Sequence, residues 1–314
     1  MRALLFLLLT GCAVETATAT QPIIGGEDAS TATYKTVVDL EETPGNWFCT
    51  GTLIDKDWVL TAAHCVTGES EETPAVLHIR FDADDINSGT TGTAVAVSEV
   101  HFNPGYNEND WDNDIAVIKL ATSITDRTPT PVHRPTVAFG TMVTQVGYGD
   151  ADDNGNGAGT LRKLDTPTID CAMAMDATVS NDNLLCFNAH DGNTSCYGDS
   201  GGPAFVNGEV AGITSGGTGN KCSQGWDLFT SVAAEIAFVD QYVPVVGATT
   251  GSGSDTGSDT TGGGDTGGGT GSDTQDGTKS DGGGCNASGN GSLGGLLMVA
   301  GVLVVRRRRS MLRA

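Results

Sequence analysis

Short apolar runs separated by turns rich in glycine, asparagine and aspartate make up the body of this chain. The runs cover residues 37–40, 76–79, 94–100, 115–120 and 210–213. Such spacing is typical of strands joined by tight turns, so it predicts an all-β barrel or sandwich. The pattern alone leaves the order of the strands in the sheets open.

The pattern changes twice toward the carboxyl end. Residues 233–243 carry Ile236, Val239 and Val243 at helical spacing, which predicts a closing helix with these three on its buried face. Residues 247–284 are almost entirely glycine, serine, threonine and aspartate, with Gly-Ser-Asp-Thr recurring. That stretch has no apolar side chains for a core, so we expect a flexible acidic linker.

Residues 285–314 form a further segment in which Cys285 is followed by an apolar run at 293–305 and by arginines at 306–309. The apolar run is shorter than the roughly 20 residues of a membrane-spanning helix. Its arginine flank fits a cytoplasmic stop. The arrangement resembles the C-terminal sorting tails of myxobacterial surface proteins (MYXO-CTERM-like segments). The resemblance implies clipping near Cys285 and retention at the bacterial cell surface or outer membrane; an unprocessed membrane anchor is the alternative.

The amino-terminal residues 1–22 are expected to be an export signal and a short pro-segment. Arg2 precedes an apolar run, as in secretory signals. The sequence ending at Cys12 resembles a bacterial lipobox, which implies a lipid on that cysteine. Ordinary signal cleavage after Ala19 is the alternative.

Acidic residues outnumber basic ones by 39 to 16, giving a net charge of −23. This excess argues against a nucleic-acid partner, which requires a basic face. The aspartates at 82, 84 and 85 could bind calcium, but they match no EF-hand spacing, and a solvated acidic loop is favoured. We therefore predict no metal and no cofactor.

The segment 198–203, Gly-Asp-Ser-Gly-Gly-Pro, places Ser200 in a glycine-rich turn. A serine hydroxyl becomes a good nucleophile when a base takes its proton and backbone N–H groups face the developing oxyanion. A histidine and an aspartate are present in suitable contexts. His64 follows the apolar run 58–60, and Asp114 stands at the head of the run 115–120.

These motifs, in the order histidine, aspartate, serine, closely resemble the chymotrypsin/trypsin-like family of serine endopeptidases. Further matches lie at 48–54, 101–106 and 147–149, and the resemblance covers about residues 23–246. It implies two six-stranded antiparallel β-barrels with a triad in the cleft between them. Ser200 would attack the substrate, His64 would act as base and then acid, and Asp114 would orient the histidine. The N–H groups of Gly198 and Ser200 would form the oxyanion hole.

The resemblance also implies activation by cleavage before Ile23, whose new ammonium would pair with the buried carboxylate of Asp199. A first strand with a simple Gly-Gly turn is the alternative interpretation of this segment. Pro22 stands where family zymogens usually carry arginine or lysine. We therefore expect a separate activating peptidase rather than autoactivation.

Specificity is less clearly encoded. The family position at the floor of the specificity pocket is Thr194 here, where trypsin-type enzymes carry aspartate. Asp227 lies on the opposite wall and could attract an arginine or lysine side chain. A broader chymotrypsin- or elastase-like preference is the alternative. Ser215, Gly216 and Gly217 are expected to bind an extended substrate backbone.

Six of the eight cysteines fall inside the protease-like region. Spacing and the family pattern imply the pairs Cys49–Cys65, Cys171–Cys186 and Cys196–Cys222, although sequence cannot fix connectivity. Paired cysteines indicate an extracytoplasmic location. The sequence thus predicts an exported, surface-attached serine endopeptidase made as a zymogen and acting on proteins or peptides. A catalytically silent binding or adhesion module on a protease fold is the alternative.

Overall fold

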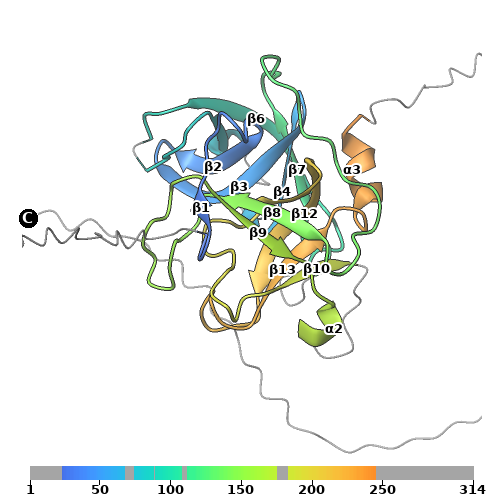
Figure 1. Cartoon of the computed structure of the whole chain (residues 1–314). Coiled ribbons are helices and arrows are strands. Elements are labelled where there is room, and N and C mark those ends of the chain that lie inside the picture. The colour runs from blue at the N-terminus through green and yellow to red at the C-terminus, as the bar shows by residue number, and fades with distance from the viewer. Residues whose placement is uncertain (1–22, 68–73, 88, 108–111, 175–182, 245–314) are drawn as a thin grey trace, which may run out of the picture. The chain divides into compact units, whose positions relative to one another are not determined.

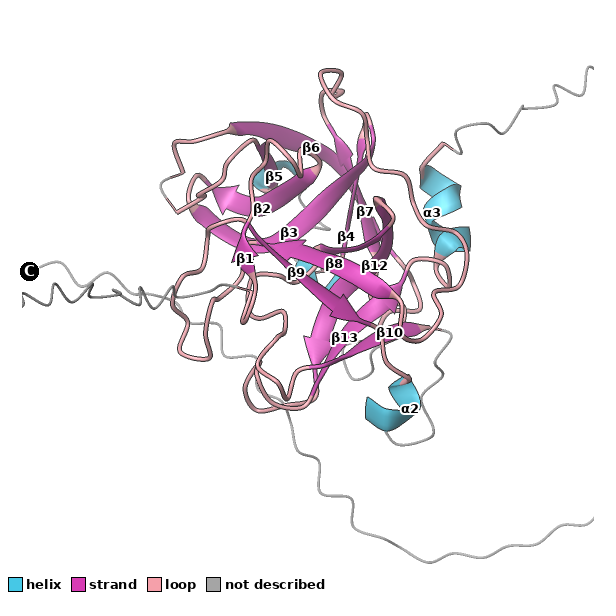
Figure 2. Ribbon diagram, viewed as in Figure 1, coloured by secondary structure: helices cyan, strands magenta, loops and turns pink. Residues whose placement is uncertain are grey.

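The computed structural model describes residues 23–67, 74–87, 89–107, 112–174 and 183–244. Strands dominate these residues (Figures 1 and 2). The elements, in chain order, are β1 (Glu27–Asp28), β2 (Val37–Thr43), β3 (Asn46–Asp55), β4 (Trp58–Thr61), η1 (Ala63–Cys65), η2 (Pro74–Val76), β5 (His78–Phe81), β6 (Thr93–Phe102), β7 (Ala116–Leu120), β8 (Met142–Gly147), β9 (Arg162–Pro167), α2 (Cys171–Ala174), β10 (Leu184–Asn188), β11 (Pro203–Val206), β12 (Glu209–Gly217), β13 (Trp226–Ser231) and α3 (Ile236–Tyr242).

The strands form two antiparallel systems, which confirms the predicted chymotrypsin-like fold class. The first is a closed barrel in the order β2-β3-β4-β7-β6-β5. The second is a sheet of seven strands in the order β1-β9-β8-β11-β12-β13-β10, in which the short β1 adds to β9 at one end. The two systems meet where the backbone N–H of Thr50 in β3 donates to the carbonyl of Ser200, at 2.8 Å.

Four of the five predicted runs begin within one residue of the start of a strand. The apolar run at 76–79 is the exception, because its first residue closes the turn η2 and the strand β5 begins only at His78. The closing helix is also shorter than predicted and begins at Ile236. Val239 and Val243 are buried and Ile236 is partly buried against the core, as its helical spacing predicted.

The first barrel encloses a carboxyl group that the strand pattern did not reveal. Asp39 in β2 is fully buried, and neither of its carboxyl oxygens has a hydrogen-bond partner among the described residues. Burial, together with the nearby charge of Glu41, raises the pKa of Asp39 to about 7, and the opposing charge of Arg80 does not offset this. The folded protein therefore keeps Asp39 protonated below neutral pH.

We expect the free energy of unfolding to carry a pH dependence from Asp39. Because its folded pKa lies above the unfolded value, its contribution is full below about pH 4 and is lost as pH rises toward 7. The Asp39→Asn variant should lose this dependence and gain a few kcal/mol relative to the parent at pH 7.5, since each pKa unit corresponds to about 1.4 kcal/mol. Urea unfolding at pH 5 and pH 7.5 checks this; an equal offset at both pH values would contradict it.

Candidate active site

Strand pairing brings His64 and Asp114 together. β4 pairs with β7 with Thr61 opposite Ala116, so the turn η1 after β4 and the loop before β7 lie at the same end of the barrel. His64 Nδ1 lies 2.7 Å from Asp114 Oδ2, and the backbone N–H of His64 donates to Asp114 Oδ1 at 2.9 Å. Two contacts to one carboxylate fix both the position and the orientation of the imidazole.

Three further features fix the position of Asp114. The preceding residue, Asn113, adopts a φ of 58°, a left-handed conformation that asparagine tolerates better than most residues. The Ser215 hydroxyl donates to Asp114 Oδ2 at 2.6 Å, and the Thr230 hydroxyl donates to the Asp114 carbonyl at 3.0 Å. Burial alone would raise the pKa of Asp114, but the imidazole of His64 and the hydroxyl of Ser215 outweigh it and the pKa is lowered. Asp114 is therefore a carboxylate at neutral pH.

Ser200 sits in a turn whose glycines are required by the space around them. Gly198 has a φ of +99°, and a Cβ there would lie 2.5 Å from the Trp47 ring. A Cβ on Gly201 would lie 2.0 Å from the Thr61 hydroxyl. Ser200 itself is half-buried, in contrast to the fully buried Asp199 beside it. The turn thus holds its serine at the surface while its backbone packs closely against the first barrel.

Asp199 is a buried carboxyl group that forms no ion pair with any described residue. It accepts hydrogen bonds from the backbone N–H groups of Gly149 at 2.7 Å and Cys196 at 2.8 Å. Burial raises the pKa of Asp199 to about 7 despite these two bonds, and the neighbouring Asp227 adds to the rise. The charge of Arg162 interacts with Asp199, but its guanidinium donates hydrogen bonds to Asp28 and to the Gly157 carbonyl instead.

The segment that begins at Ile23 enters the same region. Ile23 is 1% exposed, and the carbonyl of Ile24 accepts a hydrogen bond from the N–H of Thr194 at 2.9 Å. Thr194 lies five residues before Asp199 in the chain. The start of the described chain is therefore tied to the loop that precedes the serine.

Asp227 and Thr194 come together beside Ser195. Asp227 lies in β13 opposite Gly217 of β12 and is 3% exposed. Its Oδ2 accepts from the N–H of Ser195 at 3.0 Å and its Oδ1 accepts from the Ser195 hydroxyl at 2.7 Å. Burial raises the pKa of Asp227, and the bonds from Ser195 and Thr194 offset part of that rise. The carboxyl group of Asp227 is thus buried against Ser195, which directly follows Thr194.

The predicted substrate-binding edge is the end of β12. The register between β12 and β13 shifts between Thr214 and Gly216, which marks a β-bulge at Ser215. Bulges redirect side chains, and this one accompanies the bond from the Ser215 hydroxyl to Asp114. Gly216 and Gly217 follow the bulge and leave the backbone open on this side.

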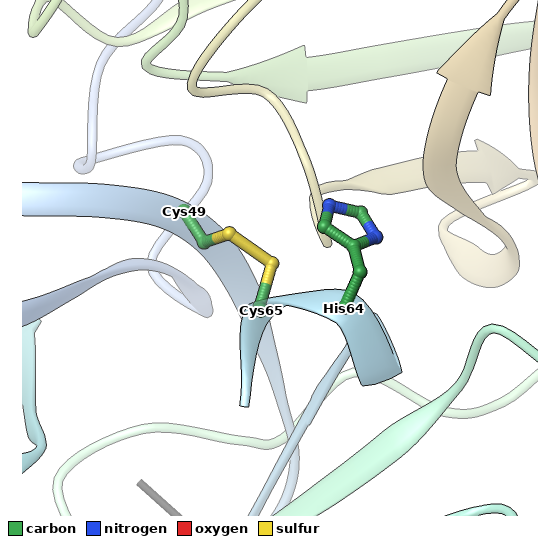
Figure 3. A group of neighbouring side chains, drawn as sticks. All are labelled: Cys49, His64 and Cys65. Carbon is green, nitrogen blue, oxygen red and sulfur yellow. A yellow bond between two sulfur atoms is a disulfide. The ribbon is translucent and has the colours of Figure 1, made fainter. Parts of the chain in front are cut away.

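Three disulfides join the described cysteines. They are Cys49–Cys65, Cys171–Cys186 and Cys196–Cys222, the pairs that the resemblance implied. Figure 3 shows the Cys49–Cys65 bond beside His64. The sulfur atoms of this pair and His64 lie close enough to suggest a metal site, but disulfide sulfurs offer no thiolate ligand. The disulfide instead braces the turn that carries the imidazole.

The acidic cluster considered for calcium points its carboxylates to separate partners. Asp82 pairs with Arg127, Asp84 accepts from the N–H and hydroxyl of Thr31, and Asp85 accepts from the N–H of Asn87. Carboxylates engaged in this way do not converge on one point. The cluster has the character of a hydrogen-bonded acidic loop.

Several predictions concern residues outside the described ranges. Cys12, Cys285, the signal and pro-segment, the linker and the arginine-flanked tail all lie there. Within the described ranges, no helix combines the length and apolar character needed to cross a membrane.

The sequence does not predict the structural roles of four side chains at this site. Ser215 was assigned only to substrate binding, yet its hydroxyl bonds to Asp114. Ser195, Thr230 and Thr50 were assigned no role. Each acts through a contact between residues more than 30 positions apart in the chain. Such contacts leave no local pattern in a single sequence.

Comparison with known proteins agrees with this geometry. A family model described as Trypsin matches residues 23–240. Trypsin-1 of Salmo salar is 33% identical over 227 residues, which are 70% of this chain and 89% of the relative. Trypsin eta of Drosophila erecta is 30% identical, with 77% of this chain and 96% of the relative covered. Brachyurin of Leptuca pugilator is 36% identical over 59% of this chain and 83% of the relative. With the family model and these relatives matching most of its length, the chain belongs to the trypsin family and is a trypsin-like serine endopeptidase.

Proposed function

We propose that this protein is an exported zymogen whose active form hydrolyses peptide bonds through Ser200, His64 and Asp114, with a preference for arginine or lysine before the cleaved bond. The observation that carries the triad is the double contact of His64 with the ionised Asp114. The Ser200 turn packs against Thr61, three residues before His64. If the histidine and aspartate only stabilised the fold, there would be no reason for a serine to sit nearby in a turn whose glycines, Gly198 and Gly201, leave no room for side chains.

The proposed reaction runs in two halves. In the first, His64 Nε2 takes the Ser200 proton as Oγ attacks the substrate carbonyl, and the N–H groups of Gly198 and Ser200 donate to the oxyanion. The same proton then passes to the amine as the C–N bond breaks, which leaves an acyl-enzyme. In the second half, water attacks the ester carbonyl and gives its proton to His64, and the Ser200 oxygen leaves with that proton. Asp114 holds Nδ1–H and stabilises the imidazolium in both halves.

The proposed preference for basic residues depends on Asp227. Its carboxyl group is buried, and among the described residues it accepts hydrogen bonds from the uncharged Ser195 and Gln145. An arginine or lysine side chain entering between Thr194 and Gly217 would supply the missing opposite charge. Close charge pairs at some interfaces are coupled by about 1.5–7 kcal/mol, and truncating one partner leaves the other charge buried and unpaired.

We expect the Asp227→Asn variant to lose about a hundredfold in kcat/KM for arginine and lysine substrates. Removing one partner of a buried charge pair typically costs about 2–5 kcal/mol, and a hundredfold loss lies within that range. Hydrolysis of substrates with leucine or phenylalanine at the same position should change little. A peptide library cleaved by parent and variant gives both numbers. A parent enzyme without preference for arginine or lysine would contradict the proposal and would favour a broader pocket floored by Thr194.

Activation is proposed to release Ile23 as a new amino terminus. Asp199 supports this, because its buried carboxyl group forms no ion pair among the described residues. A buried carboxylate needs a partner, and an ammonium at Ile23 would supply one. Pro22 implies that a separate peptidase makes the cut. Amino-terminal sequencing of the active enzyme should return Ile23 first, and a different start would contradict this form of activation.

Surface attachment rests on the sequence of the tail. The glycine-rich linker would hold the protease domain away from the membrane, and the segment after Cys285 would provide retention. Fractionation of cells that express either the full chain or a chain ending at residue 246 tests whether the tail retains the protein at the membrane. The full chain should pellet with membranes and the shortened one should not.

A further inference from the structure

The turn that carries Ser200 has four consecutive carbonyl groups, each bound by its own donor. The four bonds run from Asp150 N to Tyr197 O at 2.8 Å, from Thr50 Oγ1 to Gly198 O at 2.9 Å, from Gly202 N to Asp199 O at 2.8 Å and from Thr50 N to Ser200 O at 2.8 Å. In a trans peptide the N–H points away from the carbonyl of the same unit. Fixing the carbonyls of Tyr197 and Asp199 therefore fixes the N–H directions of Gly198 and Ser200.

Thr50 supplies two of these four donors. It lies in β3 with no exposed surface, and its backbone N–H and side-chain hydroxyl reach the carbonyls two residues apart. The N–H of Tyr148 points to the same hydroxyl at 3.4 Å. Since an N–H can only donate, the hydroxyl hydrogen is left for the carbonyl of Gly198.

Gly198 is the residue of this turn that most needs such a support. It has no side chain to restrict its backbone, and it adopts a φ of +99°. Its carbonyl lies between the two peptide units whose N–H groups would bind the oxyanion. Rotation about its backbone bonds would therefore turn one N–H relative to the other, and oxyanion binding depends on preset donor directions.

We propose that the Thr50 hydroxyl is a positioning group for the oxyanion hole, which it holds through the carbonyl of Gly198 without touching the substrate. This inference rests on the proposed role of Gly198 and Ser200. It assigns to Thr50 a part in stabilising the transition state and no part in binding the ground-state substrate.

The test uses two matched pairs of active enzyme made from the full chain: parent against Thr50→Val, and Thr50→Ser against Thr50→Ala. Within each pair the hydroxyl is the main difference. We expect removal of the hydroxyl to lower kcat about tenfold with little change in KM, a smaller loss than the hundredfold or more for deleting an oxyanion donor itself. Thr50→Ser should retain most of the parent kcat. The second pair has less bulk and keeps the test valid where Thr50→Val fails to fold.

A second measurement separates this role from general loss of structure. A peptide aldehyde forms a tetrahedral adduct with an oxyanion, whereas the corresponding peptide alcohol binds without one. Loss of the hydroxyl should weaken aldehyde binding about tenfold, in step with kcat, and leave alcohol binding unchanged. Equal weakening of both inhibitors, unchanged kcat, or an equal loss in Thr50→Ser would overturn the inference. Persistent hydrolysis by Ser200→Ala would instead overturn the proposed function itself.

Discussion

Replacing Ser200 with alanine is expected to lower kcat by about 10⁶-fold, while the protein folds and binds substrate as before. The hydroxyl is the only group of this turn that would form a covalent bond to the substrate. The remaining oxyanion donors and substrate binding leave a residual rate about 10³–10⁴-fold above that in water. The free energy of unfolding should change by less than about 0.5 kcal/mol, since the side chain is only partly buried. Steady-state hydrolysis of a fluorogenic peptide set measures the loss.

Ser98→Ala provides the matched control for this substitution. Ser98 is exposed on β6 in the first barrel, and its hydroxyl donates to the carbonyl of Lys119. Its removal should leave kcat unchanged. Retention of more than one hundredth of the parent activity by Ser200→Ala would show that hydrolysis proceeds by another group.

The Asp114→Asn variant is expected to lower kcat by about 10⁴-fold, the loss typical of this change in Ser-His-Asp proteases. Asp114 Oδ2 meets both the His64 ring and the Ser215 hydroxyl, and Oδ1 accepts from the backbone N–H of His64. The asparagine amide has one donor end. Facing the backbone N–H of His64 would set two donors against each other, so the donor end is expected to face the His64 ring. An N–H facing His64 Nδ1 favours the tautomer with its proton on Nε2, which cannot accept the proton of Ser200. The loss therefore comes from a wrong tautomer in an intact geometry.

The effect should appear in kcat with KM nearly unchanged, because Asp114 does not touch the substrate in this account. Asp126→Asn is the control: Asp126 pairs with Arg127 on the surface of the first barrel, and Arg127 keeps a second partner in Asp82. A loss for Asp114→Asn of less than tenfold would mean that His64 does not depend on this carboxylate for its orientation.

The fold class and the central site could be predicted from the sequence because their signals are local. Strand runs, turn glycines and the motifs around His64, Asp114 and Ser200 each occupy a few neighbouring residues. The boundaries were less accurate. The helix α3 begins at Ile236 because the preceding residues form turns after β13 and Glu235 bonds to Asn103, and neither feature interrupts the helical spacing.

The supporting contacts could not be predicted because each joins strands that are distant in the chain. Thr50 reaches Gly198 across 148 positions, and Ser215 reaches Asp114 across 101. Asp39 lies within an apolar run, and the run alone predicts only that it belongs to a strand. Its burial is a consequence of the closed barrel, in which every residue from Val37 to Glu41 in β2 is buried.

The most direct test of the account is covalent labelling of the active enzyme with a peptidyl fluorophosphonate, which reacts with a serine that a neighbouring base has activated. Intact mass and peptide mapping should show one adduct per chain, located on Ser200, with activity falling in proportion to labelling. Ser200→Ala and His64→Ala should both remain unlabelled. An adduct on another residue, or full activity without an adduct on Ser200, would contradict the assignment of Ser200 as the nucleophile.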